Sequence, residues 1–489
     1  MSGRMFWRGV WGYLPANAVQ GLVGLGSIVV FTRLLSPEEY GRYALAFSVL
    51  VLAHTSVFTW LEAAMARFWA AERDEGLSAH FATLYRTFFA LAVPFALVAG
   101  LALWIWPAAP ALKGAVAAAL GTVVAKSLVQ LARERRRAAG EVASASLLDM
   151  AQTAGGFLLG AGLAAAGLGA RGPLLGLLLG ALLLVPFVLP RELSFAKGGG
   201  FEPARARAYA AYGLPVSASL ILALGLASLD RFLIAGFLDA EAVGAYHAAY
   251  TLANRTLDVL FVWLGAAGGP ALVAALERGG PAELNKAARE QASTMLLLGL
   301  PAAAGLALVA RPLSELLVGE GLRVAAAQVT PWAAVSALFA GLTTYYFHQA
   351  FTLGRRTTLL LAAMAVPAVA NLALNLILLP RFGLPGAAWA AAASYAIGAL
   401  ASFAIGRKAT RLPLPWNTLL RCAFATAAMA VVVALLPDLG GLAELALKAG
   451  AGVVVYGACA WALDAGGVRE AAARTLFPRF NAFLSGRPA

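Results

Sequence analysis

Apolar runs of about 20 residues recur along the whole chain, and short segments with charges, Gly or Pro separate them. A helix rises about 1.5 Å per residue, so a run of this length crosses the roughly 30 Å hydrocarbon core of a bilayer. Fourteen runs match this pattern, near residues 9–32, 43–66, 82–106, 114–131, 144–168, 173–190, 209–236, 244–268, 291–310, 324–350, 357–379, 384–406, 416–436 and 443–464. The pattern predicts an all-α polytopic membrane protein with about 14 transmembrane helices.

Twelve or thirteen spans stay open as alternatives, because the sixth run is short and "RLPLPWN" at 411–417 sets the last two apart. The composition favours a membrane protein too: of 489 residues, 61% are hydrophobic and 12% are charged, which is more apolar surface than a soluble core buries. Arg4 and Arg8 lead into a long run without a small-residue cleavage site. We therefore expect a first membrane helix and no cleaved signal peptide.

Residues with distinctive chemistry are sparse. Cys422 and Cys459 lie inside apolar runs without CxxC or Cys/His spacing, so we interpret them as packing residues. The 4 histidines are scattered singly, and neither GxSxG nor the GxxxxGK[ST] phosphate loop occurs. The sequence therefore predicts no enzyme, no metal site and no cofactor.

The Lys and Arg residues indicate an orientation. With the amino terminus in the cytoplasm, eight fall on the outer side, namely Arg33, Arg42, Lys113, Arg171, Arg311, Arg323, Arg381 and Lys448. Five lie within or at the edges of helices, namely Arg86, Lys126, Arg231, Arg255 and Arg421, and the remaining 24 of 37 face the cytoplasm, including those of a predicted turn at 132–140. The positive-inside rule thus places both termini in the cytoplasm and accounts for the net charge of +13 without nucleic acid.

Two stretches of the chain recur about 200 residues later. "GYLPANAVQ" at 12–20 resembles "YGLPVSASL" at 212–220, and "SPEEYGRYALAF" at 36–47 resembles "DAEAVGAYHAAY" at 239–250. The second pair matches Glu38, Gly41, Tyr43 and Ala46 with Glu241, Gly244, Tyr246 and Ala249. Six predicted spans separate the copies, so the repeat is parallel, which is characteristic of transporters.

The repeat predicts three parts of the chain. Residues 1–208 and 209–412 would form two six-helix lobes, and residues 413–489 would add two helices and a cytoplasmic tail. Within the copy at 36–47, Ser36 and Pro37 are expected to begin a helix at an outward-facing turn. Gly41 is expected to allow another backbone to approach closely.

A known family resembles the chain at these motifs. "TRLLSPEEYGRYALAF" at 32–47, "LDRFLIAGFLDAEAVGAY" at 229–246 and "LPRFGLPGAAWAAAASY" at 379–395 are similar to the pattern of bacterial polysaccharide-biosynthesis transporters, the oligosaccharide flippases. Their superfamily also holds multidrug/toxin extruders and peptidoglycan lipid flippases. The resemblance extends to about residue 412, and the last two spans match no motif of the family.

The resemblance implies two six-helix lobes around a central cavity that opens alternately to the two sides of a bacterial inner membrane. The implied cargo is a polyprenyl-diphosphate-linked oligosaccharide, moved to the outer leaflet for cell-surface polysaccharide biosynthesis. The implied partners are this cargo, membrane lipids, H⁺ or Na⁺, and a polysaccharide polymerase or glycosyltransferases. Without a phosphate loop, energy would come from an ion gradient or from the cargo gradient.

Ionisable side chains inside spans cost at least about 2.5 to 3.5 kcal/mol each on insertion scales, so they are candidates for function. The candidates for cargo binding are Arg67, Arg86, Lys126, Arg255, Tyr345 and His348, and those for ion coupling are Asp258, Asp149 and Glu62. Each has a structural alternative: cations snorkel, aromatic residues form interfacial belts, and polar side chains join helices.

Spacing sharpens three of these hypotheses. Arg255 and Asp258 are three residues apart and can pair on one helix face, either as a static ion pair or as a switch that frees Arg255 when Asp258 binds a cation. Asp149 lies on a face that lines the cavity or bonds to a neighbouring helix. Adjacent Asp230 and Arg231 point about 100° apart and are expected to bind different partners.

The basic excess among these side chains suits a diphosphate cargo. A cation-coupled extruder of small molecules is the alternative, and it would require an acidic, aromatic cavity. A membrane-embedded glycan-processing enzyme would display carboxylates or histidines in long loops, and such sets are missing from the sequence.

Overall fold

The computed structural model describes residues 3–72 and 77–470. This part of the chain is helical and contains no β-strand, which confirms the predicted all-α class. Arg73, Arg474, Arg479 and Arg487, which the orientation argument assigns to the cytoplasm, lie outside the described residues.

The chain forms two compact units, of which unit 1 comprises residues 1–248 and 319–322. Its helices are α1 (Gly3–Leu34), α2 (Pro37–Val57), α3 (Thr59–Glu72), α4 (Leu77–Ile105), α5 (Pro110–Ala138), α6 (Val142–Leu163), α7 (Arg171–Phe195) and α8 (Pro203–Phe237), followed by the start of α9 (Ala240–Leu308). A π-helical segment, Ala164–Leu168, extends α6.

Unit 2 comprises residues 249–318 and 323–489. It holds the rest of α9, then α10 (Ala310–Leu317), α11 (Arg323–Leu342), α12 (Gln349–Leu353), α13 (Thr357–Gly406), α14 (Trp416–Ala434) and α15 (Gly441–Ala462). Between α11 and α12 lies a second π-helical segment, Thr343–Phe347. The lobe boundaries at residues 208 and 412 remain predictions.

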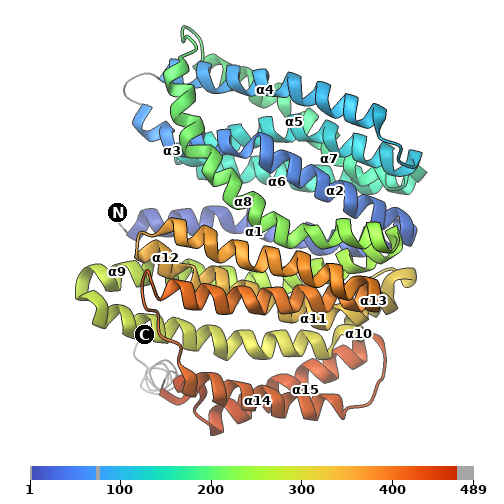
Figure 1. The fold of residues 1–489 in the computed structure, drawn as a ribbon, viewed down its shortest axis with the longest axis vertical. Coiled ribbons are helices and arrows are strands. Elements are labelled where there is room, and N and C mark those ends of the chain that lie inside the picture. The colour runs from blue at the N-terminus through green and yellow to red at the C-terminus, as the bar shows by residue number, and fades with distance from the viewer. Residues whose placement is uncertain (1–2, 73–76, 471–489) are drawn as a thin grey trace, which may run out of the picture. The chain divides into compact units, whose positions relative to one another are not determined.

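In the described part, 11 helices are long and apolar enough to cross a membrane, or 12 with the bent pair α2 and α3. Two of these helices are too long for one crossing: α9 has 69 residues and α13 has 50, or roughly 104 Å and 75 Å at 1.5 Å per residue. Each contains a glycine with positive φ, Gly280 in α9 and Gly383 in α13, where two helices meet. Figure 1 shows α9 folding back on itself. When α9 and α13 each count as two crossings, the total agrees with the expected fourteen.

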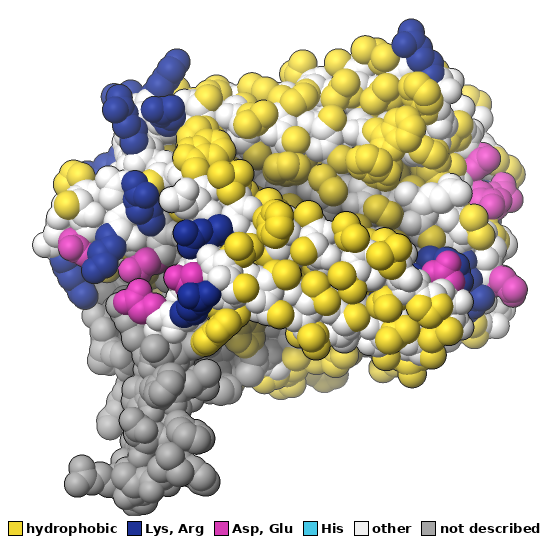
Figure 2. Space-filling model, turned by 90° about the horizontal axis from the view of Figure 1, so that it is seen from below, with side chains coloured by type: hydrophobic (Ala, Val, Ile, Leu, Met, Phe, Trp, Pro, Cys, Tyr) yellow, Lys and Arg dark blue, Asp and Glu magenta, His cyan; other side chains and the backbone are white. Residues whose placement is uncertain are grey.

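The described surface suits a lipid environment. Large apolar side chains are mostly exposed on or next to several helices, among them Phe187, Leu435 and Val453 at 81%, 80% and 74%. In the face that Figure 2 displays, hydrophobic side chains cover the middle and the charged ones gather toward the two ends. Such extensive apolar surface is a liability in water and the normal exterior of a membrane protein.

The predicted start of the second helix is confirmed. Ser36 caps α2, because its Oγ accepts from the Glu39 N–H at 3.2 Å while its own N–H donates to Glu39 Oε2 at 3.0 Å. Pro37 occupies the first helical position, where its missing N–H costs nothing.

Three glycines of unit 1 bring backbone against backbone near this turn, and we call their contacts the glycine crossing. A Cβ on Gly41 would overlap the carbonyl oxygen of Ala240, which confirms the predicted close approach. A Cβ on Gly244 would lie 3.0 Å from the Pro37 carbonyl oxygen. Gly319 donates its N–H to Thr32 Oγ1 at 2.7 Å and likewise has no room for a Cβ. The two copies of the repeat therefore meet at their matching glycines.

The other end of α8 is joined to α3 and α4 by side chains, which we call the side-chain clasp. His80 Nδ1 and the Tyr209 hydroxyl are 2.6 Å apart and both residues are fully buried. Arg205 forms ion pairs with Glu72 at the end of α3 and with Glu202. Figure 1 shows α8 running across unit 1 from α3 toward the turn between α1 and α2.

The predicted turn at 132–140 is wrong for most of its length, because α5 continues to Ala138. Arginines in the last turn of a helix interact favourably with the helix dipole. Arg135 and Arg136 are also buried, and both pair with Glu192 of α7 at 3.3 Å. This buried cluster fastens the end of α5 to α7.

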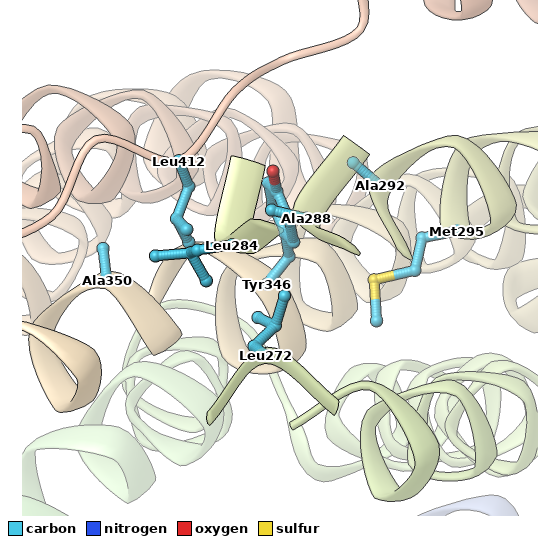
Figure 3. Packing of buried hydrophobic residues seen from close by; sticks show 8 residues of the cluster. All are labelled: Leu272, Leu284, Ala288, Ala292, Met295, Tyr346, Ala350 and Leu412. Atoms are coloured by element: carbon cyan, nitrogen blue, oxygen red, sulfur yellow. The ribbon is translucent and has the colours of Figure 1, made fainter. Parts of the chain in front are cut away.

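In unit 2, an apolar cluster forms around Tyr346 (Figure 3). Leu272, Leu284 and Met295 of α9 surround the ring together with Leu412 from the chain that follows α13. The Tyr346 hydroxyl donates to the carbonyl oxygen of Pro413. The cluster thereby fixes the segment before α14 to the bundle.

The hairpin of α14 and α15 packs on α9 through a second apolar cluster. Cys422 is buried with Ala460 against Leu297 and Leu300. The Tyr456 hydroxyl donates to the Leu297 carbonyl oxygen at 2.6 Å. Both cysteines are free thiols, and burial of Cys422 is consistent with a packing role.

Charged groups hold the turn of this hairpin against α10. Arg311 lies 3.1 Å from Glu315 and 3.0 Å from Asp438, and Lys448 lies 2.8 Å from Asp438. The Gly441 N–H donates to Glu315 at 2.8 Å. This hydrogen bond, together with Arg311, lowers the pKa of Glu315, and Lys448 lowers the pKa of Asp438.

Candidate functional site

A break between α2 and α3 shapes the candidate site in unit 1. The two helices are bent by 46° around Phe58, whose buried ring packs 4.9 Å from Phe88 and 5.9 Å from Phe95 of α4. The prediction of one continuous helix over residues 43–66 is therefore wrong. The hydroxyl of Thr59 lies 3.5 Å from the His54 carbonyl oxygen, and such side-chain bonds to the backbone compete with regular helix.

The break brings together two side chains that a straight helix would separate. His54 and Glu62 are eight residues apart, or about 12 Å along an ideal axis, yet His54 Nε2 lies 3.3 Å from Glu62 Oε1. Glu62 is only 7% exposed, and its Oε1 forms no hydrogen bond. On the other side of the imidazole, Nδ1 lies 2.8 Å from Ser127 Oγ of α5.

Lys126 precedes Ser127 on α5 and is half-buried. Burial disfavours the charged form of its amino group, Glu62 favours that form and Arg133 opposes it. Among the described residues, Lys126 forms no hydrogen bond and no ion pair within 4.0 Å. It lies five residues, or about 7.5 Å, before the end of the span predicted at 114–131. The site therefore holds a lysine amino group without a direct anionic partner.

The neighbouring charges, in contrast, are compensated. Asp149 of α6 pairs with Arg133 of α5 and accepts a hydrogen bond from Gln20 of α1 at 2.5 Å. Arg133 also lies 3.4 Å from Glu134. Of the two alternatives for Asp149, the contacts match bonding to neighbouring helices.

Arg67 and Arg86 make no comparable contacts. Both are exposed, on α3 and α4, and neither forms a hydrogen bond or an ion pair within the described residues. Their role as cargo-binding cations stays a prediction.

Unit 2 holds a second group of predicted residues around Tyr345. The ring of Tyr345 covers Gly265 of α9, where any Cβ would overlap it. Asp258, which precedes Gly265 by two turns on α9, is an electrostatic neighbour of both Tyr345 and Arg255. Asp258 and Arg255 form no ion pair within 4.0 Å, so in this conformation the two charges act on each other at longer range.

The π-helical segment Thr343–Phe347 positions this second group. Such segments leave backbone groups outside the regular ladder and often occur at functional sites. The Tyr345 carbonyl oxygen accepts from Gln291 Nε2 at 3.1 Å, whereas Gln291 Oε1 and Thr343 Oγ1 are buried without a partner. His348 follows the segment, and its Nε2 lies 3.4 Å from Ser402 Oγ.

The adjacent pair Asp230 and Arg231 has different partners, as expected. Asp230 accepts from the Tyr246 hydroxyl, and Arg231 lies 3.5 Å from Ser48 Oγ and 3.4 Å from Ser228 Oγ. These contacts join α8 to α2 and to the start of α9.

Sequence reasoning missed His54, Ser127 and Gln291 as members of these groups. No Gly or Pro marks the break in "HTSVFTWLE" at 54–62. The one available signal was the placement of a His and a Glu in a single apolar span.

The arrangement defines a polytopic helical membrane protein with polar groups buried inside its bundle. A family model described as "Polysaccharide biosynthesis protein" matches residues 30–326, and the chain belongs to this family. Among curated protein sequences, none matches the chain significantly.

Solved structures share the fold at low sequence identity. "Lipid II flippase MurJ, inward closed conformation" has a TM-score of 0.74 and 14% identity, covering 91% of this chain and 97% of that chain. A multidrug resistance MATE family transporter of the MOP superfamily, in an inward-facing conformation, has a TM-score of 0.64 and 17% identity, covering 80% and 94%. A MOP superfamily transporter from Pyrococcus furiosus has a TM-score of 0.56 and 15% identity, covering 83% and 95%. The chain thus has the fold of membrane transporters.

Proposed function

We propose that the protein is a flippase that moves a polyprenyl-diphosphate-linked oligosaccharide from the cytoplasmic to the outer leaflet by alternating access. Membership of the polysaccharide biosynthesis family and the fold shared with a lipid flippase support this class. The proposal includes a bacterial inner membrane, both termini in the cytoplasm, and two lobes at 1–208 and 209–412. Glycosyltransferases or a polymerase that handle the same glycan are the proposed protein partners.

The observation that carries the proposal is the state of Lys126. A membrane protein normally pairs a charge that lies within a span. Lys126 instead has no anion within 4.0 Å among the described residues, whereas nearby Arg133 is paired with Asp149. A diphosphate is an anion that would complete such a site, and a lysine binds it as a point charge. Arg67 and Arg86 are proposed to add positive charge along the path.

The test is flipping of a lipid-linked oligosaccharide in proteoliposomes. Lys126→Ala removes the uncompensated cation and is expected to lower the rate by about tenfold or more, the effect of losing a charge-assisted bond. Lys197→Ala, at an exposed lysine between α7 and α8, is the matched control. The triple variant with Arg67→Ala and Arg86→Ala should flip more slowly still. Wild-type rates in the triple variant would refute the assignment of these cations.

A second candidate function is supported by one feature of unit 2. Asp258 and Tyr345 are electrostatic neighbours, and an acid beside an aromatic face suits an organic cation. This is the chemistry of a cation-coupled small-molecule extruder. Gradient-driven efflux of a cationic dye that Asp258→Asn abolishes, with no flipping of lipid-linked sugar, would favour this function over the flippase.

Asp258 also remains our proposal for coupling to H⁺ or Na⁺ in a flippase. In that role it would weaken the attraction of Arg255 for phosphate until a cation neutralises it. Asp258→Asn should then bind cargo at least as well as the wild type but lose its response to an ion gradient. Wild-type turnover with the same gradient dependence would make Asp258 structural.

A further inference from the structure

Two turns of unit 2, one between α12 and α13 and one after α13, carry cations that no function described so far uses. We call them the basic patch: Arg355, Arg356, Arg407, Lys408 and Arg411. The two turns touch each other, because a Cβ on Gly354 would lie 2.8 Å from the carbonyl carbon of Ala409. All side chains of the patch are exposed, so they form one positively charged surface.

The basic patch has no carboxylate to compensate it. Between Glu320 and Asp438 the chain contains no Asp or Glu. Within the described residues, the patch forms no ion pair within 4.0 Å and no side-chain hydrogen bond, and only Arg407 has a contact, over the Phe403 ring at 5.8 Å. In unit 1, by contrast, the arginines within residues 133–137 are all paired with carboxylates. The charge of the patch is therefore open to an anion from outside the chain.

Two arginines of the patch occupy positions that are unfavourable for the fold itself. Arg355 has a φ of 53°, in the left-handed region that favours glycine. Arg356 lies at the amino end of α13, where the helix dipole repels a cation. Side chains held at such a cost point to a role outside folding.

The surroundings of the patch favour a lipid as the source of the anion. Arg356 directly precedes α13 and Arg407 directly follows it, so the charges begin where the apolar helix ends. Leu400 near the end of α13 is exposed, and Trp416 at the start of α14 is 61% exposed. Tryptophan is enriched at the level of the lipid headgroups. A phospholipid can place its acyl chains along the apolar side chains and its phosphate against the arginines.

We propose that the basic patch binds the phosphate headgroups of anionic phospholipids in the leaflet that it faces, which is the cytoplasmic one in the proposed orientation. Clusters of about four to eight Lys and Arg beside a membrane helix attract anionic lipids, and arginine binds phosphate through two parallel N–H groups. This binding does not depend on which cargo the protein moves.

The patch is also connected to the second group of candidate site residues. The Tyr346 hydroxyl donates to the carbonyl oxygen of Pro413, two residues after Arg411. Tyr346 belongs to the π-helical segment that contains Tyr345. A lipid that orders the turn after α13 is therefore expected to stabilise this segment as well.

The experiment measures binding of phosphatidylglycerol to the full chain in detergent micelles by native mass spectrometry, with zwitterionic phosphatidylcholine as the reference lipid. Arg356→Gln combined with Lys408→Gln should raise the dissociation constant by about five-fold for each cation removed. Lys197→Gln combined with Arg381→Gln is the matched control, because both side chains are exposed, lie outside the patch and form no ion pair within the described residues. The control should keep the affinity of the wild type.

A second variant separates lipid binding from folding, and it serves if the double variant does not fold. Glycine adopts the backbone conformation of Arg355 without strain. Arg355→Gly should therefore be at least as stable as the wild type in thermal unfolding, yet bind phosphatidylglycerol about five-fold more weakly. An arginine with a purely structural role would leave the affinity for lipid unchanged.

Four outcomes would overturn the lipid site. They are wild-type affinity in a folded variant of the patch, an equal loss of affinity in the control, equal affinity for phosphatidylcholine, and displacement of phosphatidylglycerol by inorganic phosphate at equal concentration. The second would mean that total charge binds the lipid, the third that apolar contacts hold it, and the fourth that the site takes a soluble anion. None of them bears on the flippase proposal, which depends on Lys126.

Discussion

The glycine crossing and the side-chain clasp lie toward opposite ends of α8 in unit 1, and they hold the helices of this unit together with different chemistry. The crossing packs Gly41, Gly244 and Gly319 against backbone atoms. The clasp uses an imidazole, a phenol and an ion pair. Backbone packing responds neither to pH nor to salt, and it opens only if whole helices separate. Side-chain bonds open by rotation about χ angles. Unit 1 therefore has one stiff end and one adjustable end.

The strongest test of the comparison is Gly41→Ala. The added methyl would overlap the Ala240 carbonyl oxygen, so the helices must move apart, at a cost of at least the roughly 1–3 kcal/mol of an overpacked site. Thermal unfolding of the purified protein should show a clear loss of stability. Gly21→Ala is the matched control, because no atom lies within 4 Å of the position that its methyl would occupy and alanine favours helix. Similar melting temperatures for the two variants would mean that the crossing is not tightly packed.

A smaller effect is expected from His80→Phe in the clasp. It leaves the buried Tyr209 hydroxyl without the partner that lies 2.6 Å away, which costs about 1–3 kcal/mol. Adding Tyr209→Phe should recover part of this loss, because no polar group is then left unsatisfied. If the double variant is less stable than His80→Phe alone, the bond between the two side chains is not what stabilises the clasp.

The ion pair of the clasp should contribute less to stability than the hydrogen bond between His80 and Tyr209. Arg205 and Glu72 are partly exposed, with 23% and 18% of their side chains accessible, and such pairs contribute up to about 1 kcal/mol. A double-mutant cycle with Arg205→Ala and Glu72→Ala measures the coupling, which should shrink at high salt. A coupling energy well above that of His80 with Tyr209 would make the ion pair, and not the buried hydrogen bond, the main contact of the clasp.

The least perturbing experiment establishes which end of unit 1 faces the outside of the cell and which faces the cytoplasm. We expect a cysteine in place of Glu38, near the crossing, to react with an impermeant maleimide added outside intact cells. A cysteine in place of Arg137, an exposed residue at the end of α5, should react only after the membrane is permeabilised. Arg136 is unsuitable, because it is buried against Glu192. The opposite labelling pattern would invert the proposed orientation.

The crossing was predictable from sequence, and the site at Glu62 was not. Gly41 and Gly244 stand at matching positions of a repeat, next to a helix start that Ser36 and Pro37 mark. These signals depend only on residues close together in the chain, so they can be recognised in the sequence. The number of spans was predictable for the same reason, since the length and hydrophobicity of each apolar run are local properties of the sequence.

The partners of the buried charges depend on packing between distant segments. His54 meets Glu62 because α2 breaks at Phe58, a position without Gly or Pro. Asp149 meets Arg133 and Gln20 because α1, α5 and α6 adjoin. No residue pattern in the sequence indicates the π-helical segment that contains Tyr345. Tertiary contacts determine all three, so sequence could name the ionisable residues but not their partners.

The placement of the two thiols has a practical consequence. Cys422 and Cys459 both belong to the C-terminal hairpin, where Cys422 is fully buried in the cluster with Ala460. From Met1 to Arg421 the chain has no native thiol. Spin labels or fluorophores attached to single introduced cysteines would therefore report on either end of α8 with background from Cys459 alone. Distances between two such probes could follow the turnover cycle in a protein altered at only a few positions.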